Sequence, residues 1–278
     1  MKILVTGASG QLGTDVVSEL KKREYTVIAA DIAEMDITDE KSVTDFIESA
    51  RPDVVVHCAA YTAVDAAESD EAKCEAINVN GTENIAKASV GVGAKLIYIS
   101  TDYVYDGKGD KPHTEDEQTN PLSVYGRTKL GGELAVKKYT DKYFIVRTSW
   151  VFGKHGKNFV KTMLTLAETH DKLTVVCDQI GSPTYTPDLA RLLADMCESD
   201  SYGVYHATNE GYCSWYEFAK EIFSLAGKNT EVEPIATKDY KCAAVRPLNS
   251  RLSKDKLSAN GFERLPDWRD ALVRYLAD

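Results

Sequence analysis

An apolar strand that runs directly into a glycine-rich turn, near the N-terminus, constrains the fold more than any other feature. Residues 3–5 are Ile-Leu-Val, a short continuous apolar run typical of a strand buried on both faces of a parallel sheet. Gly7, Gly10 and Gly13 follow, and then an amphipathic helical stretch. In such a βα unit the glycines allow a tight turn, close approach of backbone N–H groups to a pyrophosphate, and close packing of helix against strand.

A carboxylate follows the second apolar strand. Asp31 directly follows the strand 27–30. It lies close to the ~20-residue offset from the glycine turn at which a carboxylate binds an adenosine ribose. No Arg follows Asp31 closely to hold a 2′-phosphate, which favours NAD(H). The alternatives are a plain tight turn and a solvated Asp31, because three glycines alone are weak evidence.

The alternation of strands and helices continues to about residue 150. Apolar strands at 53–57, 95–99 and 143–146 are separated by helical stretches that include 43–47 and 71–92. This pattern predicts an α/β fold, a Rossmann-like doubly wound parallel sheet with a smaller α/β substrate-binding lobe. We expect residues 1–150 plus about 185–208 to form the dinucleotide-binding domain, and about 151–184 and 209–278 to form the lobe.

Composition narrows the classes of partner. The 278 residues carry a net charge of −10, with no Lys/Arg run longer than the three residues 21–23, which argues against binding of nucleic acid or anionic membranes. No apolar run approaches the ~18 residues of a membrane span, and the first strand is too short for a signal-peptide core, so we expect a soluble cytoplasmic protein. The six cysteines lack any Cys-x-x-Cys pair, which predicts free thiols rather than a zinc site or disulfides.

Three side chains predict a proton-transfer site. Thr101 follows a buried strand, and Tyr125 and Lys129 lie one turn apart on the next helix. A lysine ammonium near a phenol stabilises the phenolate and lowers the pKa of the tyrosine, which makes Tyr125 a candidate general acid. Thr101 would donate a hydrogen bond to a carbonyl oxygen, so that hydride from a nicotinamide and a proton from Tyr125 reduce a ketone. We expect the polar segment 106–119 to be a surface loop that borders the site.

Competing signals are weaker. Tyr216 and Lys220 repeat the Tyr-x-x-x-Lys spacing, but they lie on an amphipathic helix without a strand-end hydroxyl upstream and are interpreted as structural. His57 belongs to a strand and is interpreted as a core residue. The motifs of zinc hydrolases, serine hydrolases and P-loop NTPases are not found in the sequence.

These residues resemble the extended short-chain dehydrogenase/reductase superfamily, with Gly7-x-x-Gly10-x-x-Gly13 as the cofactor turn and Thr101, Tyr125 and Lys129 as the catalytic triad. Within it, the whole chain resembles the dTDP-4-dehydrorhamnose reductases. The motifs that carry the resemblance are Ser-Thr-Asp-Tyr-Val-Tyr at 100–105, Arg-Thr-Ser-Trp-Val at 147–151, Asp-Gln-x-Gly-x-Pro-Thr at 178–184 and Arg-Pro-x-Asn-Ser at 246–250.

The resemblance implies an oxidoreductase that reduces the 4-keto group of dTDP-4-dehydro-6-deoxy-L-mannose to dTDP-L-rhamnose with NADPH or NADH. Its implied sugar contacts are Thr101, Asp102 and Trp150. Its implied cofactor contacts are Gly10, Gln11 and Leu12 at the diphosphate, Asp31 at the ribose, Asp36 and Ile37 at the adenine side, and Ala60, Tyr61 and Thr62 at the middle, together with Tyr125 and Lys129. Some relatives have His where this chain has Tyr61. Some members of the family bind Mg²⁺ at a dimer interface, so Mg²⁺ and a homodimer stay open.

The diphosphate of a dTDP-sugar needs cations, and an arginine fork suits phosphate oxygens best. The candidates are Arg246, Arg251, Lys154 and Lys157, of which Arg246 lies within its motif and is the predicted contact.

Two other functions remain open at this point. The regulatory subunit of methionine adenosyltransferase resembles the same family and acts as a non-catalytic NAD(P)-binding subunit, although the complete Thr101, Tyr125 and Lys129 set argues against that. A nucleotide-sugar epimerase or dehydratase would retain its NAD through a redox-neutral reaction.

Overall fold

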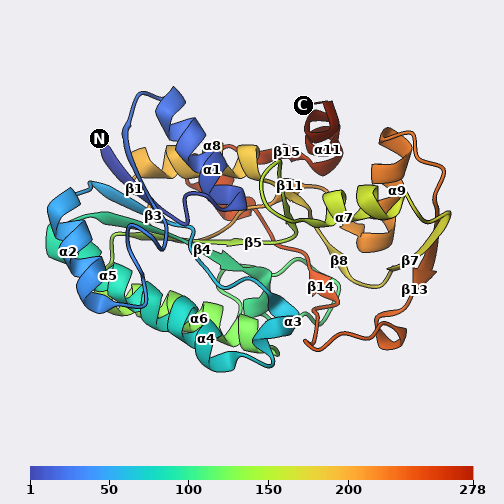
Figure 1. Ribbon diagram of the computed structural model, residues 1–278, viewed down its shortest axis with the longest axis horizontal. Coiled ribbons are helices and arrows are strands. Elements are labelled where there is room, and N and C mark those ends of the chain that lie inside the picture. The colour runs from blue at the N-terminus through green and yellow to red at the C-terminus, as the bar shows by residue number, and fades with distance from the viewer. Residues whose placement is uncertain (278) are drawn as a thin grey trace.

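The computed structural model describes residues 1–277 and is built on a six-stranded parallel sheet (Figure 1). The strand order is β10-β5-β4-β3-β1-β2, and every neighbouring pair is parallel. The order reverses between β1 and β3, and ligands of such sheets bind at the carboxyl edge beside this reversal. The bounds are β1 Lys2–Thr6, β2 Thr26–Ala30, β3 Val54–His57, β4 Lys95–Thr101, β5 Tyr143–Thr148 and β10 Gly203–His206.

Helices cover both faces of this sheet, which confirms the Rossmann-like prediction (Figure 1). One face packs on α1 (Gln11–Lys22) and α8 (Thr186–Glu198), and the other on α2 (Glu40–Ala50), α5 (Thr82–Val92) and α6 (Val124–Tyr139). The apolar positions read from the sequence lie in these two cores: Val16 and Leu20 of α1, and Val43 and Ile47 of α2, are 0% exposed. Burial of these amphipathic faces holds the helices on the sheet.

The helix predicted for residues 71–92 is three consecutive segments. They are α4 (Glu71–Glu75), a π-helical segment (Ala76–Gly81) and α5, with the short α3 (Val64–Ala67) before them. In the π-helical segment the Asn78 side chain accepts the Tyr61 N–H at 2.8 Å and donates to the Tyr61 carbonyl at 3.1 Å and to the Thr128 hydroxyl at 3.1 Å. A π-helical turn often marks a functional region, and this one ties the loop after β3 to α6.

Most of the remaining elements pack around a third core, whereas Leu257 and Leu265 belong to the core on the α1 and α8 side of the sheet. The largest fully buried side chains of the third core are Phe152, Phe218 and Trp268. Residues 186–206 leave this region and return to the main sheet as α8 and β10. The elements here are β6 (Val151–Phe152) paired with β9 (Thr184–Tyr185), β7 (Lys172–Val176) with β13 (Glu231–Ile235), β8 (Ile180–Gly181) between β12 (Cys213–Ser214) and β14 (Asn249–Ser250), β11 (Asn209–Glu210) with β15 (Leu265–Asp267), and the helices α7 (Phe159–Leu166), α9 (Trp215–Leu225), α10 (Asp255–Ala259) and α11 (Trp268–Ala277).

Several smaller predictions can be compared with the structure directly. The buried face of α9 includes Phe218 and Ile222, and Lys220 is exposed, as expected for a structural Tyr-x-x-x-Lys pair. His57 is 1% exposed, bonds Thr6 and Thr82, and burial lowers its pKa to about 3, so it is a neutral core residue. The six cysteines are free thiols. Within residues 1–277, no helix combines the length and apolar character needed to cross a bilayer.

Candidate active site

Two cavities lie at the carboxyl edge of the sheet and share part of their lining. The first measures about 640 Å³ and the second about 580 Å³, and Gly7, Gly10, Cys58 and Ala60 line both. Of the residues predicted for the site, the first cavity is lined by Gly7, Gly10, Gln11, Leu12, Gly13, Ala60, Thr62, Thr101, Asp102, Tyr125, Lys129 and Trp150. The second is lined by Gly7, Gly10, Asp31, Asp36, Ile37 and Ala60.

The glycine turn packs so closely on neighbouring backbone that side chains would not fit at Gly7 and Gly13. A Cβ at Gly7 would lie 2.8 Å from the Ala59 backbone, and Gly7 has a φ of +62°. A Cβ at Gly13 would lie only 2.0 Å from the Gly7 carbonyl oxygen. Helix α1 begins here without a side-chain cap and without an acidic residue in its first turn. These features suit a pyrophosphate at the helix N-terminus, whose N–H groups and dipole attract anions.

The second cavity carries carboxylates at its rim. Asp31 accepts a hydrogen bond from the Ser9 N–H at 3.0 Å, which fixes the glycine turn against the end of β2. Hydrogen bonds from Thr38 lower the pKa of Asp36 below its ordinary value. Lys73 is the cation among the lining residues. The arrangement therefore presents hydrogen-bond acceptors for ribose hydroxyls more readily than a positive site for an additional phosphate.

The three proposed reaction residues line one cavity, as the sequence predicted. Thr101 ends β4, and Tyr125 and Lys129 follow Ser123, whose hydroxyl caps α6 by accepting the Gly126 N–H at 3.1 Å. A Cβ at Gly126 would lie 2.3 Å from the Tyr103 carbonyl oxygen, so this glycine lets α6 pack closely on the turn after β4. This close packing brings α6, which carries Tyr125 and Lys129, against β4, which ends at Thr101.

Burial moves the pKa values of Tyr125 and Lys129 in opposite directions. Lys129 is 2% exposed, its Nζ donates to the Ile99 carbonyl at 2.7 Å, and it lies 4.1 Å from the centre of the Tyr98 ring. Burial lowers the pKa of Lys129 to about 7. Burial also raises the pKa of Tyr125 above its usual range, against the opposing effect of a hydrogen bond with Thr101. The sequence predicted a lowered tyrosine pKa; the structure instead keeps the phenol neutral, the state that a proton donor needs.

Asp102 links the end of β4 to the C-terminal motif. It accepts hydrogen bonds from the Thr101 hydroxyl at 3.0 Å and from the Ser250 hydroxyl, and it is 3% exposed. Burial raises the pKa of Asp102 to about 6, although both hydrogen bonds oppose the rise. Because the Thr101 hydroxyl donates to Asp102 here, it must turn to donate to a substrate oxygen.

Trp150 has an unusual backbone conformation and stacks on a second tryptophan. Its φ is +51°, which is rare for a bulky side chain, and its ring stacks on Trp215 with centroids 3.7 Å apart. Trp215 and Gln179 line the first cavity beside Trp150. Gln179 belongs to a motif already singled out, whereas Trp215 follows the helical apolar pattern of α9 and carried no separate signal.

Two predicted contacts lie outside the lining of both cavities. Tyr61 is held through its backbone by Asn78, and its ring packs near Tyr125 and Val124. Arg246 pairs with Asp65 at 2.5 Å and donates to the Tyr103 hydroxyl at 3.4 Å. Of the four candidate phosphate-binding cations, Lys157 lines the first cavity.

The side chains of residues 1–277 do not form a metal-binding cluster. No group of three or more His, Cys, Asp or Glu side chains in this range is arranged to hold a metal ion. The Mg²⁺ considered from the sequence therefore has no site formed by these residues alone.

The parallel sheet, the glycine turn, and the half-buried Tyr125 with the buried Lys129 in one cavity define an NAD(P)-binding oxidoreductase of Rossmann-like fold. The family model described as the RmlD substrate binding domain matches residues 1–278, and the chain belongs to this family. It is 44% identical over 277 residues to a spore coat polysaccharide biosynthesis protein of Bacillus subtilis, covering 100% of this chain and 97% of that protein.

Solved structures of the same family superpose closely. A dTDP-4-dehydrorhamnose reductase from Clostridium acetobutylicum is 45% identical with a TM-score of 0.98, covering 100% of this chain and 99% of that one. A dTDP-4-dehydrorhamnose reductase from Bacillus anthracis, in complex with NADP, is 44% identical with a TM-score of 0.97, covering 99% of this chain and 98% of that one.

Proposed function

We propose that this protein reduces the 4-keto group of dTDP-4-dehydro-6-deoxy-L-mannose to give dTDP-L-rhamnose, with NADPH or NADH as the reductant. The observation that carries the proposal is that Thr101, Tyr125 and Lys129 line the same cavity as the glycine turn, in a chain of this family. The reduced nicotinamide, as hydride donor, and the Tyr125 phenol, as proton donor, would then lie at one edge of the sheet.

The cofactor would lie across the two cavities. The N–H groups at the start of α1 would bind its pyrophosphate, Asp31 its adenosine ribose, and Ala60 and Thr62 its middle portion. When bound, the reduced nicotinamide supplies the hydride. Asp31, Asp36 and the single cation Lys73 in the second cavity support a preference for NADH over NADPH. The segments that hold it are residues 1–150 and about 185–208, which we propose as the cofactor-binding unit.

The protein's own residues would deliver the proton and hold the sugar. The hydride adds to the carbonyl carbon, and the Tyr125 phenol gives its proton to the carbonyl oxygen, so the ketone becomes an alcohol and the cofactor is oxidised. Thr101 donates a hydrogen bond to that oxygen as negative charge develops, and the Lys129 ammonium stabilises the Tyr125 phenolate that remains.

Recognition of the sugar nucleotide would fall to the other side of the first cavity. Asp102 and Trp150 would contact the sugar, and Lys157 would approach the diphosphate directly. Arg246 would reach a phosphate only after it leaves Asp65. We propose the segments of about 151–184 and 209–278 as this substrate-binding lobe. A cytoplasmic location and a homodimer accompany the proposal, and size-exclusion chromatography tests the dimer.

The test combines the purified protein with dTDP-4-keto-6-deoxy sugars, or with their UDP counterparts, and either NADH or NADPH. We expect one equivalent of cofactor to be oxidised for each dTDP-sugar converted, with dTDP-L-rhamnose identified by NMR. A redox-neutral conversion with retained NAD would replace the proposal by an epimerase or dehydratase. Cofactor binding without turnover of any sugar would favour a regulatory subunit.

A further inference from the structure

A buried carboxylate stands one helical turn beyond Lys129. Glu133 on α6 is 0% exposed and accepts the Ser100 hydroxyl at 2.6 Å, the Arg147 Nε–H at 2.8 Å and an Arg147 Nη–H at 2.7 Å. Ser100 immediately precedes Thr101 on β4, and Arg147 lies on β5. One side chain therefore joins the helix of Tyr125 and Lys129 to the two central strands whose ends line the cavity.

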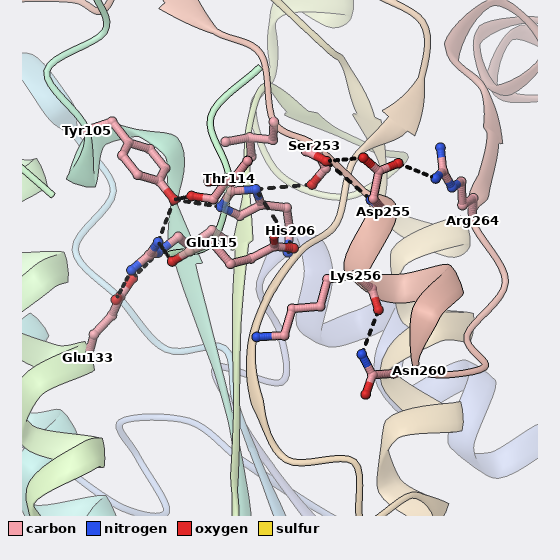
Figure 2. Close-up of polar contacts among 12 residues, drawn as sticks. Tyr105, Thr114, Glu115, Glu133, His206, Ser253, Asp255, Lys256, Asn260 and Arg264 are labelled. Carbon is pink, nitrogen blue, oxygen red and sulfur yellow. Dashed lines mark hydrogen bonds and ion pairs between the residues drawn. The ribbon is translucent and has the colours of Figure 1, made fainter. Parts of the chain in front are cut away.

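Glu133 lies at one end of a chain of polar contacts that reaches Tyr105 and His206 (Figure 2), and none of these three residues lines the cavity. Arg147 donates to the Tyr105 hydroxyl at 2.5 Å, and that hydroxyl lies 2.8 Å from the His206 Nε2. The His206 Nδ1 lies 3.1 Å from the Ser253 carbonyl oxygen, and the Tyr105 hydroxyl also donates to the Thr114 carbonyl at 2.9 Å. Burial lowers the pKa of His206 far below its ordinary value, and the ring is neutral. The far end of the network is fixed, which leaves Glu133 little freedom to move.

We propose that Glu133 is a positioning residue for the reduction: its carboxylate sets the register of α6 on β4 and places a buried negative charge one helical turn from the Lys129 ammonium. This inference rests on the proposed function for the role of Lys129. The inference adds to the proposed function a residue that contacts neither the cofactor nor the sugar.

The surroundings of Lys129 explain why such a charge matters. Burial of the ammonium favours its neutral form, and Glu133 has the largest of the opposing effects on the pKa of Lys129. The other titratable groups facing Lys129 are the thiols of Cys58 and Cys74, the His57 ring and the Tyr98 ring. Lys137, one turn further along α6, lies 3.9 Å from the Glu133 carboxylate. The thiols remain protonated, because burial raises the pKa of Cys58 to about 12 and also raises that of Cys74. Among these groups around Lys129, Glu133 is therefore the one that carries a negative charge.

A purely structural role makes a different prediction. If Glu133 only neutralised Arg147 in the core, removing both charges together would restore a normal site, because a buried ion pair can be replaced by uncharged side chains of similar size. If Glu133 acts on Lys129, the pKa of Lys129 stays below its wild-type value when Arg147 is removed as well.

The test compares Glu133→Gln and the double variant Glu133→Gln/Arg147→Met with wild type. Glu83→Gln is the matched control, because Glu83 is also bonded to α6, through Tyr139 at 2.6 Å and Lys138 at 3.1 Å, but away from the cavity. The double variant avoids an unpaired buried arginine, which protects the test if the single variant folds poorly. Two quantities are measured: the pH profile of kcat, and the pKa of Lys129 by NMR of isotope-labelled lysine, assigned with Lys129→Met.

We expect the pKa of Lys129, and with it the alkaline limb of kcat, to fall by about 1 unit or more in both Glu133 variants, with KM changed little and Glu83→Gln unaffected. A Lys129 pKa in the double variant equal to wild type would overturn the inference. The NMR result decides this even if wild type turns over no dTDP-sugar, an outcome that would refute the proposed function separately.

Discussion

Replacing Gly13 by Ala tests how tightly the glycine turn is packed. The new Cβ would lie 2.0 Å from the Gly7 carbonyl oxygen and 2.9 Å from the Ala8 Cα, and the obstacles are backbone atoms that cannot rotate away. Gly7 or α1 must therefore shift by about 1 Å to restore ordinary contact, at a cost of about 1–3 kcal/mol or more. Alanine within a helix recovers only about 1 kcal/mol, so steric strain should prevail.

Gly91 supplies the matched control on another helix. It lies within α5, and a Cβ there meets nothing within 4 Å. Gly91→Ala should stabilise the protein by up to about 1 kcal/mol through helix propensity alone. Urea unfolding measures both variants, and the difference between them isolates the cost of the close approach at Gly13.

The same displacement should weaken cofactor binding. A shift of about 1 Å at the start of α1 removes the alignment of at least one N–H group with a phosphate oxygen, a bond to a charged group worth about 1.5–3 kcal/mol. The dissociation constant for NADH should rise about tenfold or more in Gly13→Ala and stay unchanged in Gly91→Ala, as measured by nucleotide fluorescence. A Gly13→Ala protein with wild-type stability and wild-type NADH affinity would refute the packing argument.

Three further predictions concern the chemistry and the sugar. Tyr125→Phe should abolish NAD(P)H oxidation but leave cofactor affinity nearly intact, whereas Tyr216→Phe should keep wild-type turnover; near-normal activity of the first variant would contradict the proton-donor role. Because burial raises the pKa of Asp102 to about 6, the native state holds this proton more tightly than the unfolded chain, so the carboxyl lowers the unfolding free energy as pH rises from about 4 to about 6. Asp102→Asn should therefore gain up to about 3 kcal/mol over wild type between urea titrations at these two pH values, and a constant difference would exclude the effect. Trp215→Ala should remove the stack that holds Trp150 and raise KM for the dTDP-sugar about 2–10-fold with an unchanged KM for NADH; equal changes in both would argue against a separate sugar role.

The sheet and most of the site follow from local sequence patterns. Continuous apolar runs define β1, β3 and β4, since such runs suit strands buried on both faces, and the carboxyl edge of a parallel sheet then collects Gly7, Thr101 and Asp102. These features depend on residues close together in the chain. Their positions could therefore be predicted without a structure.

The parts that could not be predicted depend on partners far apart in sequence. The π-helical segment is held where Asn78 bonds Tyr61 and Thr128, and nothing in the helical periodicity of 71–92 marks that turn. Trp215 fits an apolar helix face equally well whether or not it stacks on Trp150, 65 residues earlier. Arg246 matches its motif, yet its guanidinium pairs with Asp65 instead of lining a cavity.

The position of Glu133 could have been predicted from a different signal in the sequence. A charged residue on a helix ordinarily indicates a solvated face, and α6 gave no reason to interpret Glu133 otherwise. Arg147, however, lies inside the apolar strand 143–148, and a buried arginine requires a carboxylate partner within reach. Searching for that partner among the acidic residues of the adjacent helix leads to Glu133.

The opposed pKa values of Tyr125 and Lys129 also bear on how the site recovers after turnover. Tyr125 and Lys129 lie one turn apart on α6 and line the same cavity. Once Tyr125 has given up its proton, its phenolate and the Lys129 ammonium attract each other, and the pKa of Lys129 rises while that of Tyr125 falls. At rest, burial keeps the proton on the phenol, and Glu133 keeps the charge on the lysine that the phenolate will need.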